Sequence, residues 1–354
     1  MGRHQSTTPT VKDIAKRASV SIGTVSRVLN DHADVGVALR DRVQAAIREL
    51  GYQANGRPEA ARRQSRAIGF LLCNGAGINP IHAHLLLGIE QFCSDARYYT
   101  IFTRYMYSPD QNPEHFELPE FLLQPHLVNC VIVAGVNHPN FLLALKAAKI
   151  RYVLLGNHVV DLPPGEKRVN QVRYDDYGGA FQAAQYLIQL GHRNIWYIGD
   201  TSLPWLLNRY EGFVSAMKAA DLEPRVHAYS LADDPFENGH TAVTYILERK
   251  YPATAMLCGS EELALGAREA LHQHGRDVPR DVSLIGFEHK LTPSRASNVT
   301  SISIDTVAVG RELARMAITL NESFGKDQPE VIVPSTLMKR STCRPFRQDD
   351  VMVL

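Results

Sequence analysis

The chain has 354 residues, of which 45% are hydrophobic and 21% are charged, so it can bury one large core or two and is too long for a single small module. Residues 1–66 contain 12 Lys and Arg against 6 Asp and Glu, whereas residues 67–354 contain 26 against 31. A small basic segment joined to a mildly acidic body suits a protein that touches phosphate with one end only, although a solvated basic surface would have the same composition.

Cysteine usage and the apolar pattern exclude several classes of protein. The five cysteines have neither the paired spacing of a zinc site nor that of a disulfide framework, so we expect core thiols in a reducing cytoplasm, without metal or cofactor. Residues 1–10 are polar and lack the apolar stretch of a signal peptide, and no uncharged apolar run reaches membrane-spanning length. We therefore expect neither secretion nor membrane insertion.

The first fifty residues carry the signals of three short helices. Thr10, followed three residues later by Asp13, predicts a capped helix over 11–18, and after a tight break Ser21 can cap a second helix. A third helix is expected over 38–50. The apolar residues expected to close their shared core are Val11, Ile14, Ala15, Ala18, Val25, Val28, Leu29, Leu39, Val43, Ala46, Ile47 and Leu50. Two short helices joined by so tight a turn predict a helix-turn-helix.

Polar residues in this segment carry a family resemblance that a helical core alone would not produce. They lie in the strings Val11-Lys12-Asp13-Ile14-Ala15, Val20-Ser21, Thr24-Val25-Ser26-Arg27-Val28-Leu29-Asn30 and Glu49-Leu50-Gly51-Tyr52. The chain resembles the LacI/GalR family of bacterial transcription regulators, and the resemblance covers about Thr10 to Pro345. Landmarks in the body include Asp175-Asp176-Tyr177, Leu190-Gly191-His192-Arg193, Val278-Pro279 and Arg340-Ser341-Thr342.

The resemblance implies that the second helix enters the major groove of DNA. The candidate DNA contacts are Ser21, Ile22, Thr24, Ser26, Arg27, Asn30, Tyr52, Asn55, Ala61 and Arg62. Arg27 is the strongest, because its planar fork can bond guanine O6 and N7 together. Gly23 stands where relatives often carry a base-reading side chain, so fewer groups read each half-site. Ser19 replaces the usual turn glycine at a cost on the order of 1 kcal/mol.

A hinge is expected between the head and the body. Relatives fold this segment into a short helix in the minor groove only when DNA is bound, and Pro58 could occupy its first turn. The family's wedge leucine, six residues after the asparagine that matches Asn55, is replaced by Ala61, and the segment is one residue shorter before Ile68. We therefore expect weaker bending of the DNA than is typical of the family.

From Ile68 onwards, short apolar runs alternate with helical patterns. The runs are Ile68–Leu72, Ile101–Thr103, Val131–Ala134, Val153–Leu155, Ile195–Ile198, Ala255–Cys258 and Ser283–Phe287. Such alternation predicts parallel sheets with crossover helices, and the length fits two Rossmann-like lobes. The predicted fold class is a small all-α head joined to an α/β body of the periplasmic-binding-protein type, with a ligand held between the lobes beyond the carboxyl ends of the strands.

The resemblance also proposes residues for the effector site. They are His82, Asn157, Arg209, Ser260 and Glu288. Arg209 matches an arginine that commonly anchors the effector in this family, although an exposed helix arginine is the alternative. His82 lies where relatives often stack an aromatic ring on the ligand, but a lone histidine is as often structural. Ser260, Glu288 and Gly156 depart from the family's usual polar residues, with Asn157 left to compensate for Gly156, so we expect a different ligand from that of the best-known relatives.

These observations predict a sequence-specific DNA-binding regulator, a repressor, that acts as a cytoplasmic homodimer on a palindromic operator. A small-molecule effector, a sugar or sugar derivative, is expected to control operator affinity. The alternative is a periplasmic-type solute-binding protein, but that class needs a signal peptide and has no helix-turn-helix. An enzyme is not expected, because the sequence has no nucleophile elbow, phosphate-cradling glycine loop or metal-ligand spacing.

The expected domains follow the same division. Residues 1–56 form the DNA-binding head, 57–66 the hinge and 67–354 the effector-binding and dimerisation body. Within the body, one lobe is expected over about 67–170 with 301–330, and the other over 171–300 with 331–347.

Overall fold

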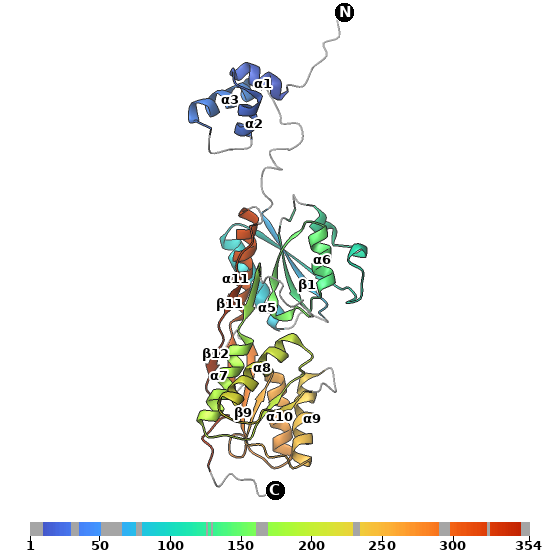
Figure 1. The fold of residues 1–354 in the computed structure, drawn as a ribbon, viewed down its shortest axis with the longest axis vertical. Helices are drawn as coiled ribbons and strands as arrows, with labels where there is room; N and C mark the ends of the chain where they lie inside the picture. The colour runs from blue at the N-terminus through green and yellow to red at the C-terminus, as the bar shows by residue number, and fades with distance from the viewer. Residues whose placement is uncertain are drawn as a thin grey trace, which may run out of the picture. The chain divides into compact units, whose positions relative to one another are not determined.

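A computed structural model describes residues 10–29, 35–50, 66–75, 80–124, 127–128, 130–160, 169–228, 234–289, 298–323 and 326–347. The chain forms two compact units, Met1–Gln64 and Ser65–Leu354, whose helices and strands Figure 1 shows. In these described ranges, no helix is both long and apolar enough to cross a membrane.

The N-terminal unit contains the three predicted helices. They are α1 (Val11–Ala18), α2 (Ile22–Leu29) and α3 (Val37–Leu50). The predicted cap of α1 is present: the carboxylate of Asp13 accepts from the backbone N and the Oγ1 of Thr10, at 2.8 and 2.7 Å. The Oγ of Ser21 accepts from the backbone N of Thr24 at 3.0 Å and so caps α2.

Among the described side chains, the small core of this unit is made as the apolar spacing predicts, with one exception, while the side chain of Leu29 lies outside the description and stays a prediction. Its buried members are Ile14, Ala15, Ala18, Val25, Val28, Val43 and Ala46, with Val11, Val20, Val35, Ile47 and Leu50 packed against them. Leu39 was expected in this core but is 39% exposed. It lies in the first turn of α3, whereas the buried residues of that helix lie in its later turns.

The first lobe of the body is built on a six-stranded parallel sheet in the order β11-β5-β4-β3-β1-β2. The strands are β1 (Ala67–Cys73), β2 (Tyr99–Tyr105), β3 (Cys130–Gly135), β4 (Arg151–Leu155), β5 (Gln171–Tyr174) and β11 (Val331–Val333). Its α-helices are α5 (Pro80–Asp95), α6 (Pro139–Ala147) and α11 (Thr306–Glu322), and its short 3-10 turns are η1 (Pro113–His115), η2 (Glu120–Leu123) and η3 (Gly156–His158). Strands β1 and β3 are buried along their whole length, as expected for the interior of a parallel sheet.

The helices of this lobe cover both faces of its sheet (Figure 1). Helices α5 and α11 lie on one face, and glycines let them approach closely, because a Cβ added at Gly88 or at Gly310 would collide with the backbone of the other helix. Helix α6 packs on the opposite face through Phe141, Leu142 and Leu145.

The second lobe has a six-stranded sheet in the order β12-β10-β9-β8-β6-β7, in which only β12 runs antiparallel to its neighbour. Its strands are β6 (Ile195–Ile198), β7 (Arg225–His227), β8 (Ala255–Cys258), β9 (Ser283–His289), β10 (Thr300–Ile304) and β12 (Thr336–Met338). Its helices are α7 (Asp176–Gln189), α8 (Pro204–Ala219), α9 (Pro235–Glu248) and α10 (Glu261–Gln273). Helices α7 and α8 pack on one face of the sheet, and α9 and α10 on the other.

The places where the chain passes between the lobes differ from the predicted limits by a few residues. Strand β5 and strand β11 belong to the first sheet, although both were expected in the second lobe. Strand β10 belongs to the second sheet, although it was expected in the first lobe. The reason is that each strand finishes in its own sheet before the chain crosses, after Tyr174, after Ile304 and after Val333.

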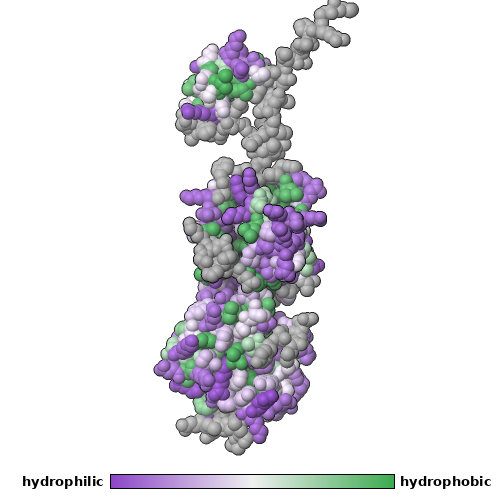
Figure 2. Space-filling model, turned by 45° about the vertical axis from the view of Figure 1, so that its right-hand side comes forward, coloured by the Kyte–Doolittle hydropathy of each residue, from purple (hydrophilic) through white to green (hydrophobic). Residues whose placement is uncertain are grey.

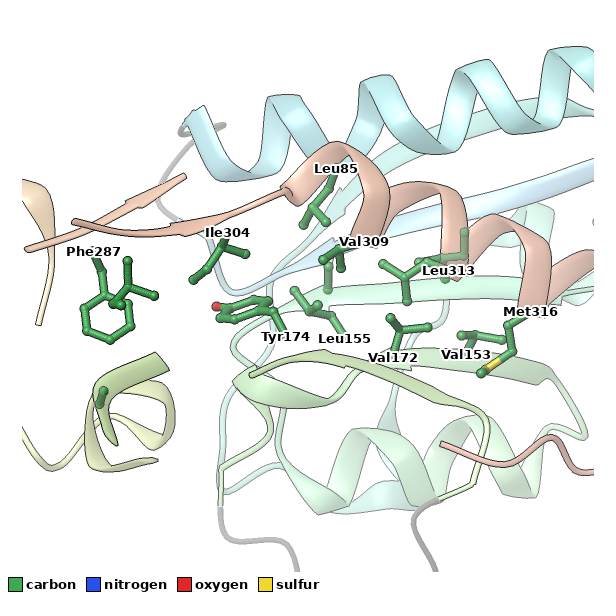
Figure 3. Packing of buried hydrophobic residues seen from close by; sticks show 14 of the residues in the cluster. Leu85, Val153, Leu155, Val172, Tyr174, Phe287, Ile304, Val309, Leu313 and Met316 are labelled. Atoms are coloured by element: carbon green, nitrogen blue, oxygen red, sulfur yellow. The ribbon is translucent and has the colours of Figure 1, made fainter. Parts of the chain in front are cut away.

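One continuous set of buried residues runs through both lobes (Figure 3). In the first lobe, Val153, Leu155 and Val172 pack against α11, and in the second lobe Phe287 belongs to the same set. Figure 3 shows the hydroxyl of Tyr174 directed toward the side on which Phe287 lies. The core therefore joins the lobes where the carboxyl ends of their strands meet, and the predicted fold class, a small helical head with a two-lobed α/β body, is confirmed.

Candidate functional site

The buried residues of α2 show which of its faces is exposed. Val25 and Val28 are buried against α1 and α3, which leaves Ile22, 50% exposed, together with Ser26 and Arg27 on the outer face. A short helix that presents an apolar, a hydroxyl and a guanidinium side chain on its exposed face has the groups needed to read base edges in a major groove.

Helix α3 fixes the turn between α1 and α2. Ser19 adopts a left-handed backbone with φ of 53°, as its replacement of a turn glycine predicts. Arg42 of α3 donates from Nη2 to the backbone oxygens of Ala18 and Ser19, at 2.7 and 3.2 Å. These bonds tie the turn to α3 and so fix the angle at which α2 is presented.

In the body, a buried ion pair lies where the strands of the two lobes end. Asp176 begins α7, Arg209 lies on α8, and both side chains are 2% exposed. Arg209 donates from Nε to Asp176 Oδ1 at 2.6 Å and from Nη1 to the backbone oxygen of Gly259, and its Cζ lies 4.1 Å from the ring centre of Phe287. Its Nη2 is buried and has no hydrogen-bond partner among the described residues.

Asn157 connects this ion pair to the first lobe. Its Nδ2 donates to Asp176 Oδ2 at 2.7 Å and to the backbone oxygen of Tyr174 at 2.9 Å, while its Oδ1 accepts from the backbone N of Tyr174 at 3.0 Å. Burial raises the pKa of Asp176, and Arg209 opposes this shift. Burial lowers the pKa of Arg209, but the charge and hydrogen bond of Asp176, with smaller effects of Tyr174 and Tyr197, together outweigh it and the net direction is up. The bonds from Arg209 and Asn157 favour the charged form of Asp176, and through them the group bridges the lobes.

Aromatic side chains and a neutral imidazole adjoin the pair. His158 Nε2 lies 2.9 Å from the hydroxyl of Tyr174, and its ring centre lies 4.6 Å from that of Trp205 on α8. Burial, with smaller effects of His82 and Arg209, lowers the pKa of His158 to about 3. The imidazole is therefore uncharged at neutral pH and can both donate and accept a hydrogen bond.

A second buried atom without a partner lies next to this group. Asn137, at the carboxyl end of β3, is fully buried and donates from Nδ2 to the backbone oxygen of Gly135 at 2.8 Å. Its Oδ1 has no partner within the described part of the chain, and its backbone N donates to the oxygen of His158. Buried polar atoms of native proteins are nearly always bonded, so an unpaired donor and an unpaired acceptor at the strand ends indicate a place for a polar ligand or water.

Comparisons with known proteins address both units. Residues 10–55 match the family model of bacterial regulatory proteins, lacI family, and residues 184–343 match a periplasmic binding protein-like domain. The chain belongs to the LacI family. It is a DNA-binding transcription regulator, and its relatives are regulators and not enzymes.

LacI-family relatives match nearly the whole chain. The transcriptional regulator CelR of Thermobifida fusca is 28% identical over 340 residues, which is 94% of this chain and 98% of CelR. The transcriptional repressor CytR of Escherichia coli K12 is 28% identical over 328 residues, 92% of each chain. A solved complex of CelR with cellobiose has a TM-score of 0.66 at 27% identity and covers 94% of this chain and 99% of that one.

The lac repressor dimer bound to operator and the anti-inducer ONPF shares the fold. Its TM-score is 0.65 at 22% identity, and the match covers 96% of this chain and all of that one.

The predicted DNA contacts of this LacI-family chain divide into two groups. Ile22, Ser26 and Arg27 lie exposed on α2. Ser21 is exposed too, but its Oγ caps the helix and lies 2.9 Å from Thr24 Oγ1, so both hydroxyls are engaged within the head. Asn30, Tyr52, Asn55, Ala61 and Arg62 lie outside the described residues and stay predictions.

The predicted effector residues are only partly brought together. Arg209 and Asn157 meet through Asp176, and His82 is buried on α5 close enough to His158 to affect its pKa. Ser260 follows Gly259, and its Oγ caps α10 by accepting from Leu263 N at 3.1 Å.

Glu288 does not join the cluster, contrary to expectation. Its carboxylate accepts two bonds from Arg340 Nη2 at 2.8 and 2.9 Å. It also follows Phe287 on a strand, where successive side chains point to opposite faces, so it points away from Arg209.

Sequence reasoning missed Asp176, His158, Trp205 and Asn137 as members of the site. Asp176 was noted only as a landmark, yet two adjacent aspartates directly after a strand are a usable signal, because the first can cap the helix and the second can face the ligand side. Asn137 and His158 also lie two and three residues after the ends of strands β3 and β4, at the sheet edge where ligands of such folds bind.

Proposed function

We propose that this LacI-family regulator acts as a cytoplasmic repressor that binds a palindromic operator as a homodimer. The head, 1–56, would read the bases, the hinge, 57–66, would order on DNA, and the body, 67–354, would dimerise and sense a small molecule. Two-fold symmetric operators follow from one recognition helix per subunit in a two-fold dimer. The exposed face of α2 supports base readout by Arg27, with an apolar contact from Ile22.

The effector half of the proposal rests on the unpaired Nη2 of Arg209. A guanidinium that is 2% exposed with one unused nitrogen is costly unless something binds it, and the effector would supply the acceptor. Asn137 Oδ1 offers a complementary acceptor to a ligand hydroxyl, and Trp205 offers a flat apolar face.

The charges favour an uncharged ligand. Asp176 already neutralises Arg209 at 2.6 Å, and His158 is neutral, so a bound carboxylate would add an uncompensated buried charge. A polyhydroxylated molecule such as a sugar or sugar derivative both donates and accepts without that cost. The likeness to CelR, solved with cellobiose, is in keeping with this class.

Coupling to the operator would run through the bridge between the lobes. Because Asn157 of the first lobe bonds Asp176 of the second, a ligand on Arg209 would shift the balance between two arrangements of the lobes. Linkage then requires that effector and operator change each other's affinity by the same factor, typically about 5- to 150-fold.

Operator titration in the presence and absence of sugars that stabilise the protein thermally tests the proposal. In Arg209→Lys the positive charge opposite Asp176 is kept but Nη2 is lost, so the response to the sugar should disappear while operator affinity without sugar changes little. Arg193→Gln, which alters an exposed arginine elsewhere in the second lobe, is the matched control and should respond as wild type does. A full response in Arg209→Lys would place the effector elsewhere, and light scattering that finds a monomer would contradict the dimer.

A further inference from the structure

The ion pair between Arg209 and Asp176 uses only part of the guanidinium edge that a carboxylate can occupy. Nε and Nη2 of an arginine lie on one edge of its planar head group and point in nearly parallel directions, so one carboxylate can accept from both. The ion pair between Arg173 and Glu330 has this arrangement, with Nε 2.6 Å from Oε1 and Nη2 3.3 Å from Oε2. In Arg209 only Nε bonds the carboxylate, at 2.6 Å from Asp176 Oδ1, and Nη2 has no hydrogen-bond partner among the described residues.

Asn157 accounts for this difference. Its Nδ2 donates to Asp176 Oδ2 at 2.7 Å, so the oxygen that could otherwise accept from Nη2 is bonded to the first lobe instead. The bonds of Asn157 to the backbone N and oxygen of Tyr174, at 3.0 and 2.9 Å, fix its side chain in that position. Hydrophilic side chains cover much of the surface drawn in Figure 2, but Asn157 is 1% exposed and both members of the ion pair are 2% exposed, so bulk water does not compete for these bonds.

We propose that Asn157 is a positioning residue, which keeps Arg209 Nη2 open for a hydroxyl group of the effector. The inference rests on the effector function proposed above for Arg209. A hydroxyl accepts from Nη2 and can still donate its own proton, whereas a carboxylate in the same place would put a second negative charge beside Asp176. Asn157 therefore favours a neutral, hydroxylated ligand without touching it, because it holds the Asp176 carboxylate on one nitrogen of Arg209.

Removal of the Asn157 amide should close this opening. In Asn157→Ala, rotation of the Asp176 carboxylate can bring Oδ2 to Nη2, as in the pair of Arg173 with Glu330, and the effector then loses its donor. In Asn157→Ala/Asp176→Asn, the amide at position 176 has only one acceptor oxygen, so one of the two nitrogens on that edge of Arg209 stays open. The second change should therefore restore the binding that the first weakens, which a purely structural role of Asn157 does not predict.

Calorimetric titration of the full-length protein tests this expectation. The probes are glucose, galactose, ribose and cellobiose, with glucuronate and galacturonate as the anionic counterparts of the first two. For each sugar that binds wild type, we expect Asn157→Ala to weaken binding at least about tenfold and the double variant to recover most of that loss. The double variant should also prefer the sugar over its uronate by a smaller factor than wild type does, because the carboxylate beside Nη2 is gone.

Asn321→Ala is the matched control. It removes an equally buried asparagine of the first lobe, also 1% exposed, whose backbone oxygen accepts from Arg151 at the start of β4. This residue lies at the other end of the sheet from Asn157, so the variant should bind sugar as wild type does.

A crystal structure of Asn157→Ala gives a second measurement that needs no effector. Asp176 Oδ2 within hydrogen-bond distance of Arg209 Nη2 would support the proposal, and an Nη2 that stays open would overturn it. Wild-type sugar affinity in Asn157→Ala would overturn it as well. Weak binding that the double variant does not recover would show instead that Asn157 contacts the ligand or shapes the pocket, and would also overturn it. Failure of the proposed effector site has a different signature, a full sugar response in Arg209→Lys or no binding of these sugars to wild type, and this inference would fall with it.

Discussion

Replacing Arg209 with methionine should destabilise the second lobe by about 3–5 kcal/mol, because it leaves a buried carboxylate without its counter-ion. Asp176 is 2% exposed and would lose its bond of 2.6 Å to Nε, keeping only the bond of 2.7 Å from Asn157 Nδ2. Methionine loses the guanidinium carbon that lies 4.1 Å from the ring centre of Phe287 but keeps most of the aliphatic length of arginine, so the loss should come chiefly from the charge and not from a cavity.

The loss should depend on pH in a defined direction. Burial raises the pKa of Asp176, and without Arg209 nothing comparable opposes that shift, so the folded pKa moves further above the unfolded value of about 3.9. A group with a raised folded pKa stabilises the protein below its unfolded pKa and loses that contribution as pH rises through the folded one. The variant should therefore be closest to wild type at about pH 4, near the unfolded pKa, and should become less stable relative to wild type as the pH rises above it.

Urea unfolding of the full chain measures this effect. The protein has two tryptophans, Trp196 and Trp205, and both lie in the second lobe, so tryptophan fluorescence reports on that lobe and on the contact of Trp205 with His158. Asp176→Asn combined with Arg209→Met should be more stable than the sum of the single changes by more than about 1 kcal/mol. A loss below about 1 kcal/mol in Arg209→Met that is the same at every pH would refute the reasoning.

Further predictions concern the head and the hinge. Arg27→Ala should weaken cognate operator binding by about 1–3 kcal/mol and relax one base preference, and equal weakening on random DNA would make it a phosphate contact. Ala61→Leu should increase operator bending in a circular-permutation gel assay, and a strong kink with the native residue would contradict this expectation. Ser19→Gly should relieve the backbone with φ of 53° and stabilise the head by about 1 kcal/mol, seen as slower hydrogen exchange in α1 and α2; unchanged exchange would show that the turn is unstrained.

Local patterns were enough to predict most of the fold. The helices of the head and the buried strands, such as β6 and β8, have apolar spacing that burial on one or both faces imposes. Five strands were missed. Strands β7, β11 and β12 have three residues each, too few to show a period. Strands β5 and β10 contain polar residues and therefore form no continuous apolar run. The predicted lobe limits were wrong by a few residues for a related reason, since no local sequence signal marks where the chain leaves one sheet for the other.

The candidate site was less predictable than the fold. Arg209 could be proposed from resemblance, but its bond to Asp176 depends on two helices of the second lobe lying side by side, and the bond from Asn157 depends on where the other lobe places the end of β4. Glu288 was expected to contact the ligand, yet its carboxylate forms an ion pair with Arg340, which lies 52 residues further along the chain. Contacts between residues so far apart in the sequence produce no local sequence pattern that could predict them.

The repeated passage of the chain between the lobes also sets the order in which the protein can be completed during synthesis. The edge strand of the first sheet, β11, is made of Val331–Val333, and β12 (Thr336–Met338) of the second sheet follows. Neither lobe is a continuous segment, so a ribosome must translate the chain past residue 333 before the first sheet is whole and past residue 338 before the second is. The head, in contrast, draws its core from residues before 51 and can fold as soon as it emerges. A chain that ends prematurely would therefore have a folded DNA-binding head joined to a body in which neither sheet is complete.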